Sequence, residues 1–149
     1  RTGKLGVLKQ HLAKDADVNR LDEKGYSALA WAAMAGEAEA VKLLLKQGAD
    51  VNQKNRDGSV ALHGSAFFGQ TGVVKLLIEG KADVNARNGQ GETALGSVAP
   101  EWNDGVKSIT QLIAGALQLK VDVEKIREAR PRIVEILRQH GGKTGGELK

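Results

Sequence analysis

The sequence has no cysteine and very few aromatic residues, and both shortages narrow the possible folds and functions. Without cysteine, the chain forms no disulfide and offers no thiolate for catalysis or metal binding. Phe, Trp and Tyr make up only 3% of its 149 residues, so a buried core must come from Leu, Val, Ile and Ala. Such a core favours closely packed helices over a β-sandwich, in which larger aromatic and β-branched residues are usual.

Long apolar runs and catalytic motifs are also missing. No apolar run approaches the roughly 18 residues that a membrane-spanning helix needs, so we expect no membrane association. The histidines His11, His63 and His140 share no metal-ligand spacing, and the chain has neither a G-x-S-x-G motif nor a phosphate-binding loop. We therefore expect no enzyme activity, no cofactor and no metal, and we interpret His63 as a structural residue at a helix start.

A strong charge of one sign is lacking as well. The chain has 22 Lys and Arg against 18 Asp and Glu, a net charge of +4. The two signs are interleaved, as in residues 124–128, which is typical of a solvated helix face with paired charges. Nucleic-acid or anionic-ligand binding is therefore the less favoured alternative, and it would use a basic stripe that includes Arg127, Arg130, Arg132 and Arg138.

What the chain does contain is a repeat of 33 residues. Residues 22–54 align without a gap with residues 55–87, and the two copies are identical at 13 positions, including an Ala-Asp-Val-Asn run. The same register continues upstream, where residues 16–19 are again Ala-Asp-Val-Asn. The chain is thus interpreted as a single domain, 1–149, that contains a partial repeat (1–21), two complete repeats (22–54 and 55–87) and a divergent capping repeat (88–149).

Each complete repeat is predicted to be a hairpin turn followed by two helices. Gly25 and Gly58 supply the positive φ that a hairpin turn requires. Apolar residues at helical spacing follow, and Gly36 or Gly69 divides each set in two. We predict antiparallel helix pairs, which must stack on neighbouring repeats to bury their apolar sides, at 29–36 with 39–47 and at 62–69 with 72–80.

These motifs resemble those of the ankyrin-repeat family. The 33-residue spacing, the Gly-x-x-Ala-Leu segment, the Val-x-x-Leu-Leu helix and the Ala-Asp-Val-Asn run all match the family's pattern. The resemblance implies an all-α solenoid of stacked helix-turn-helix units with hairpin turns, and we expect a monomeric, cytoplasmic domain. The sequence departs from the pattern at Lys81, which stands where the family has a glycine and where Gly48 and Gly141 stand in the other repeats.

The last repeat contains about 27 extra residues. Leu62 and Val74 are 12 positions apart, whereas their counterparts Leu95 and Val134 are 39 apart. The insertion at about 100–129 therefore lies between the inner and outer helices of this repeat. We interpret it as a C-terminal cap over the core, with a dedicated binding element as the alternative.

Two extra helices are predicted within this insertion. Asp104 is expected to cap the first, in which Val106, Ile109, Leu112, Ile113, Ala116 and Leu117 recur at helical spacing. A second, short helix is expected at about 123–129, capped by Asp122. The outer helix of the repeat would then begin at Pro131 and bury Ile133, Val134, Ile136 and Leu137.

The family resemblance also implies a function. Ankyrin domains generally bind a partner protein through hairpin tips and the exposed face of the inner helices. At the matching positions of this sequence the protein-binding residues would be Glu23, Lys24, Tyr26, Met34, Ala35, Arg56, Asp57, Ser59, Phe67, Phe68, Gly89, Gln90 and Glu92. The partner would be another protein, and the alternative is a structural or regulatory segment of a larger polypeptide.

Four of these residues are expected to form one exposed apolar patch: Tyr26, Met34, Phe67 and Phe68. Aromatic residues and Met commonly anchor interfaces, and this chain has few of them. The alternative is that the two Phe residues pack between stacked turns. Trp31, within the Ala-rich inner helix, is assigned to the core between repeats.

Overall fold

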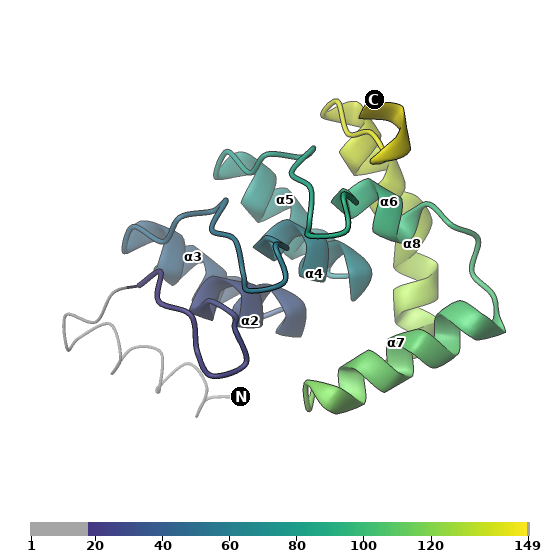
Figure 1. The fold of residues 1–149 in the computed structure, drawn as a ribbon, viewed down its shortest axis with the longest axis horizontal. Helices are drawn as coiled ribbons and strands as arrows, with labels where there is room; N and C mark the ends of the chain where they lie inside the picture. The colour runs from purple at the N-terminus through teal and green to yellow at the C-terminus, as the bar shows by residue number, and fades with distance from the viewer. Residues whose placement is uncertain (1–17, 149) are drawn as a thin grey trace.

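The computed structural model describes residues 18–148, and these residues form helices joined by turns, with no strand among them (Figure 1). The helices are α2 (Ala28–Ala35), α3 (Ala38–Lys46), α4 (Ala61–Phe67), α5 (Thr71–Glu79), α6 (Ala94–Val98), α7 (Asp104–Ala116), α8 (Val123–Gln139) and a 3-10 helix, Gly146–Leu148. None of the described helices is both long and apolar enough to cross a bilayer. The predicted all-α class is confirmed, while most of the partial first repeat lies outside the described residues.

The helices stack in two rows. The inner row is α2, α4 and α6, in which each helix packs against the next, and the outer row is α3, α5 and α8. Within the complete repeats α2 pairs with α3 and α4 with α5 (Figure 1). The four predicted helices of these repeats are confirmed, with each start displaced by one residue.

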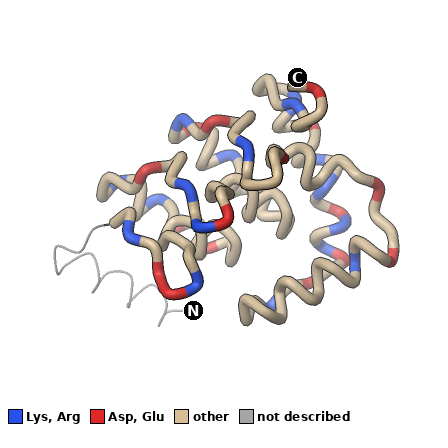
Figure 2. Tube along the Cα trace, in the orientation of Figure 1, with Lys and Arg blue, Asp and Glu red and all other residues tan. Residues whose placement is uncertain are grey.

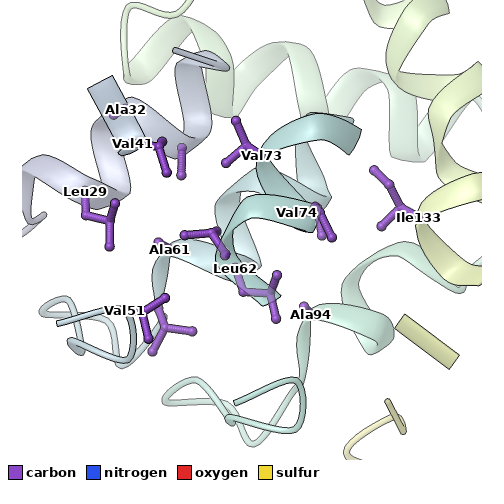
Figure 3. Close-up of a cluster of buried hydrophobic side chains, with 14 of the residues drawn as sticks. Leu29, Ala32, Val41, Val51, Ala61, Leu62, Val73, Val74, Ala94 and Ile133 are labelled. Atoms are coloured by element: carbon purple, nitrogen blue, oxygen red, sulfur yellow. The ribbon is translucent and has the colours of Figure 1, made fainter. Parts of the chain in front are cut away.

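A continuous apolar core lies between the two rows (Figure 3). Leu44, Leu77 and Leu137 occupy equivalent positions in α3, α5 and α8, and all three are completely buried. The outer helix of the last repeat also buries Ile133 and Ile136, as its apolar pattern predicts. The last repeat therefore continues the core of the others despite its insertion.

Equivalent hydrogen bonds join the turns on both sides of that insertion. The side-chain oxygen of Asn52 accepts the N–H of Asp83 (2.7 Å), and that of Asn85 accepts the N–H of Lys143 (2.8 Å). The Asn85 amide also donates to the carbonyl of Gly141 (3.1 Å), as the Asn52 amide does to that of Lys81 (3.4 Å). The acceptors Lys81 and Gly141 are separated by one 33-residue repeat and 27 further residues.

The backbone of Lys81 adopts the left-handed conformation that its position in the repeat predicts. Its φ is 75°, close to the 91° of Gly48 and the 84° of Gly141. The neighbouring Gly80 has a φ of −80°, so this glycine does not replace Lys81 as the left-handed residue. A lysine therefore occupies a conformation in which its Cβ is disfavoured.

The structure corrects two predictions about the insertion. Asn103 rather than Asp104 caps α7, because its side-chain oxygen accepts the N–H of Val106 (3.0 Å). Asp122 does cap the next helix, but α8 runs on without a break to Gln139, with Pro131 inside it.

Close packing explains why α8 is continuous. Pro131 has no N–H to donate to the preceding turn, so the helix loses one hydrogen bond there. The segment before it is held against α4, since Ile126 is buried and its Cα lies 3.0 Å from where a side chain on Gly69 would begin. This contact keeps residues 123–130 in line with the outer helix that follows.

Candidate functional site

The hairpin tips form a linked and exposed surface. The N–H of Arg56 donates to the carbonyl of Gly25 (2.8 Å), and the N–H of Gly89 donates to that of Asp57 (3.0 Å), so each tip is bonded to the next. The first two tips carry acidic and basic residues side by side (Figure 2), while the third, at residues 88–91, carries no charge. We name this the tip surface and define it by the predicted binding residues that the structure leaves exposed: Glu23, Lys24, Arg56, Asp57, Gly89 and Gln90.

Short side chains hold each tip in shape. The Asp22 carboxylate accepts the N–H groups of Lys24 (3.0 Å) and Tyr26 (2.9 Å), and Asn88 accepts those of Gln90 (2.9 Å) and Glu92 (3.0 Å). Such side-chain-to-backbone bonds mimic a turn and reduce the conformations open to the loop. Each tip therefore has a defined conformation without a bound partner.

Three of the predicted binding residues also hold the fold together. The Asp57 carboxylate accepts both the N–H (2.9 Å) and the hydroxyl (2.6 Å) of Ser59. The Glu92 carboxylate accepts the N–H of Gly145 (2.9 Å), which ties the C-terminal segment to the start of α6. Ser59 and Glu92 are only partly exposed, so the structure gives both of them a role within the domain.

The predicted exposed apolar patch is largely covered, and the prediction is wrong for two of its four residues. Met34 and Phe68 are only 5% and 4% exposed, while Tyr26 and Phe67, like the predicted Ala35, are partly exposed. All four patch residues lie in a second apolar cluster, which we call the inner-helix cluster and which also contains Trp31, Trp102, Ala114, Leu117, Leu119, Val121 and Ile126.

The chain's own insertion covers this cluster. Ala114 belongs to α7 and Ile126 to α8, and residues Leu117, Leu119 and Val121 lie between those two helices. α7 runs from the last repeat back toward the α2 end (Figure 1), where the Lys24 ammonium donates to the carbonyl of Ala116 (3.4 Å). The insertion thus occupies the face that the family resemblance assigns to a partner.

Trp31 belongs to the inner-helix cluster rather than to the core between repeats, so its assignment is also corrected. Its ring meets that of Tyr26 edge to face, with the centroids 5.3 Å apart, and its indole N–H donates to the Asp22 carboxylate. The Lys24 ammonium lies 5.8 Å from the ring. Trp31 therefore connects the first described tip to the cluster that the insertion covers.

Sequence reasoning missed the covering segment, Leu117–Val121. The five residues after α7 include three large apolar side chains, which is more than a solvated loop needs. This excess is the one signal that could have marked the segment as buried. It does not indicate which surface the segment covers.

Most arginines of the alternative basic stripe are paired with carboxylates. Their guanidinium groups lie 2.9, 3.6 and 2.9 Å from acidic partners in the pairs Arg127–Glu124, Arg132–Glu135 and Arg138–Glu147. Each of these side chains is about half exposed, so the pairs are screened by solvent. Because each of these three arginines has a carboxylate beside it, this side of α8 has little net positive charge.

The fourth arginine, Arg130, is buried and joins the insertion to the repeat. It donates to the carbonyls of Ser97 (3.4 Å), in the last turn of α6, and Pro100 (3.0 Å), just beyond it, and lies 5.4 Å from the Trp102 ring. Burial lowers the pKa of its guanidinium. A cation at the carbonyl end of a helix is favourable, so Arg130 anchors the start of the insertion.

His63 has the structural role that its position predicts. Its Nδ1 accepts the N–H of Val60 (3.1 Å), which requires the proton on Nε2, and Nε2 donates to the Glu92 carbonyl of the next repeat (2.9 Å). Burial lowers the pKa of His63 because it disfavours the charged ring. Among residues 18–148, no three His, Cys, Asp or Glu side chains converge as metal ligands would.

Comparisons with known proteins agree with this architecture. A family model described as "Ankyrin repeats (3 copies)" matches residues 1–88, more than half of the chain. The chain is also similar to the human "DNA-binding protein RFXANK", with 50% identity over 44 residues. That alignment covers 29% of this chain and 17% of the relative's length, and the insertion lies beyond the family match. The matched repeats and the stacked helix pairs place the chain in the ankyrin-repeat family.

Proposed function

We propose that this chain is a protein-binding module and that its partner contacts the tip surface. Ankyrin repeats are generally protein-interaction modules. The observation that carries the proposal is the row of exposed tips, the first two of them charged, which are bonded to one another through Arg56–Gly25 and Gly89–Asp57. Because these loops are already ordered, a partner would bind them with little loss of conformational entropy.

The charges on the first two tips support selective binding. Glu23 and Lys24 lie on one tip and Arg56 and Asp57 on the next, so a partner needs the complementary order of charges to bind both. Charge patterns of this kind contribute to partner choice and association rate more than to affinity. The apolar anchors Met34 and Phe68 lie beneath the insertion, so a partner reaches them only if the insertion is displaced.

A charge reversal on the tip surface tests the proposal. Arg56→Glu changes the central tip, and Lys75→Glu makes the same change on the exposed outer side of the same repeat. Proteins captured by the full chain would be quantified for both variants. We expect Arg56→Glu to weaken capture of the partner by at least about tenfold and Lys75→Glu to leave it unchanged. Equal capture by Arg56→Glu and the original chain would contradict the proposal.

The paired arginines of α8 support protein binding over nucleic-acid binding. A nucleic-acid site needs unpaired cations that release counterions, and Arg127, Arg132 and Arg138 already lie beside carboxylates. We expect no salt-dependent binding of a DNA duplex by the isolated chain in fluorescence anisotropy. Affinity that falls steeply with salt would favour nucleic-acid binding instead.

A further inference from the structure

A hollow of about 520 Å³ lies between the first described tip and the end of α7. Its lining comes from the tip, from α2 and from the residues after α7: Asp22, Glu23, Lys24, Trp31, Leu117 and Gln118. We call it the Trp31 hollow. Sites that hold small ligands measure roughly 300–1,000 Å³, so this one has room for a long side chain of a partner. It adjoins the tip surface, because Glu23 and Lys24 belong to both.

Negative charge exceeds positive charge in the Trp31 hollow. Two carboxylates, Asp22 and Glu23, and one ammonium, Lys24, line it. The Asp22 carboxylate is already bonded to the tip backbone and to the indole N–H of Trp31. Within residues 18–148, Glu23 is bonded only through its backbone carbonyl, which accepts from Arg56 (3.3 Å), and its exposed carboxylate has no partner. The hollow therefore offers a free carboxylate to a cation.

The chain's own Lys24 shows that a cation is accommodated beside Trp31. Its ammonium lies 5.8 Å from the ring centroid and donates to the carbonyl of Ala116 (3.4 Å) at the end of α7. The face of an aromatic ring and the carbonyl end of a helix both attract positive charge. The bond to Ala116 is longer than usual, however, and Lys24 is exposed, so a second cation can compete for this place.

We propose that the Trp31 hollow binds an arginine side chain of the partner. The guanidinium replaces the Lys24 ammonium beside Trp31 and pairs with the Glu23 carboxylate. Arginine suits these two groups, because its planar guanidinium stacks on an aromatic ring, is weakly hydrated and forms two parallel bonds to a carboxylate. This site rests on the proposed function, since it adds one side chain of the partner to the contact with the tip surface.

The site belongs to the first complete repeat alone. One repeat further on, the positions of Asp22, Glu23, Lys24 and Trp31 are occupied by Asn55, Arg56, Asp57 and Gly64. The second repeat therefore has neither the ring nor the pair of adjacent carboxylates. Leu117 and Gln118 come from the insertion, so the insertion completes the hollow on this repeat. Leu117 also gives the apolar stem of an arginine a surface to pack against.

Binding of a small arginine probe to the full chain tests the proposal. The chain has two tryptophans, so its proton–nitrogen correlation spectrum contains two indole N–H signals. Trp31 lies in the hollow, whereas Trp102 lies beside Arg130, before the start of α7. We expect Nα-acetyl-arginine amide to shift the Trp31 signal saturably, with a dissociation constant on the order of millimolar, and to leave the Trp102 signal in place. The citrulline analogue, which has the same shape and no charge, should shift neither signal.

Two substitutions at adjacent residues should act in opposite directions. Glu23→Gln should weaken probe binding by about threefold, because it removes the free carboxylate. Lys24→Gln should strengthen it by about threefold, because the neutral amide no longer competes for the ring and can still donate to the Ala116 carbonyl. Glu79→Gln is the matched control, since it removes the same charge as Glu23→Gln from an exposed position in α5, and should change nothing. An unmoved Trp102 signal in each variant shows that the insertion is still docked.

Failure of this site and failure of the tip surface are distinguishable. Probe binding needs no partner, and Arg56→Glu, which tests the tip surface by capture, does not line the hollow. Saturable probe binding together with undiminished capture by Arg56→Glu would contradict the tip surface and leave the hollow a cation site. Lost capture by Arg56→Glu with no probe binding would contradict the arginine site alone.

Three results would overturn the arginine site. Equal shifts with the arginine and citrulline probes would show that no cation is recognised. Equal effects of Glu23→Gln and Glu79→Gln would show that the probe follows the overall charge of the chain. Weaker binding by Lys24→Gln would show that Lys24 attracts the probe rather than competing with it, as an anion site would require. A weaker Glu23→Gln beside a stronger Lys24→Gln is the expected result.

Discussion

The two complete repeats and the divergent last repeat differ in the segment that connects the inner helix to the outer helix. In the complete repeats only a short turn separates α2 from α3 and α4 from α5, whereas residues 99–122 separate α6 from α8. The core is nevertheless the same, since Leu44, Leu77 and Leu137 are equally buried. The inserted residues have therefore altered the surface and left the core unchanged. They cover Met34 and Phe68, and they leave Ile109, Leu112 and Ile113 of α7 exposed.

The largest expected effect tests whether the two regions share one core. We expect Leu77→Ala and Leu137→Ala each to lower the free energy of unfolding by about 2–5 kcal/mol, because each leaves a cavity at a fully buried position. Urea denaturation measures both. A loss below about 1 kcal/mol for Leu137→Ala alone would show that the last repeat packs more loosely than the others.

The next prediction concerns the cover that distinguishes the last repeat. Ala114→Glu should destabilise the docked insertion by about 1–3 kcal/mol, because it buries a charge beside Met34 and Phe68. Hydrogen exchange should show protection lost in α7 and retained in α3 and α5. Gln111→Glu, exposed on the same helix, is the control. Uniform loss of protection would show that the cover and the repeats unfold together.

A third prediction tests the joint between a complete repeat and the last one. His63 connects Val60 to Glu92 only while its ring is neutral. Its pKa is lowered in the folded chain, so its contribution is complete above the unfolded value of about 6.5 and declines as pH falls toward the folded pKa. We expect His63→Ala to cost about 1–2 kcal/mol at pH 8, and the difference to shrink at acid pH. A difference independent of pH would contradict this role.

Local pattern predicted the repeats well because each repeat contains its own signals. Gly25 and Gly58 mark the hairpins, and the spacing of Val41 and Leu44 marks a helix that the structure confirms. Local pattern did not predict that the insertion covers the inner-helix face. This covering depends on a cluster that brings together residues such as Phe68 and Leu119, which lie far apart in the chain and carry no shared motif.

The same distinction explains the error at Pro131. Proline after a short apolar segment usually marks a helix start, and locally nothing contradicted that interpretation. The packing of Ile126 against Gly69 holds the preceding segment helical, and this contact joins two repeats. A tertiary contact thus prevailed over a local preference.

The smallest expected effect returns to the turn that both regions share. Lys81 and Gly48 occupy the same position in successive repeats, with φ of 75° and 91°. Lys81→Gly should relieve backbone strain and be neutral or stabilising by up to about 1 kcal/mol, since glycine adopts this conformation without a Cβ penalty but gains entropy when unfolded. Gly48→Lys is the reciprocal variant and should destabilise by about the same amount. No atom lies within 4 Å of a Cβ placed on Gly48, so only backbone strain opposes it. Thermal and urea denaturation of the two variants should shift in opposite directions. If Lys81→Gly clearly destabilises the chain, the lysine makes a contribution at this turn that outweighs its strained backbone.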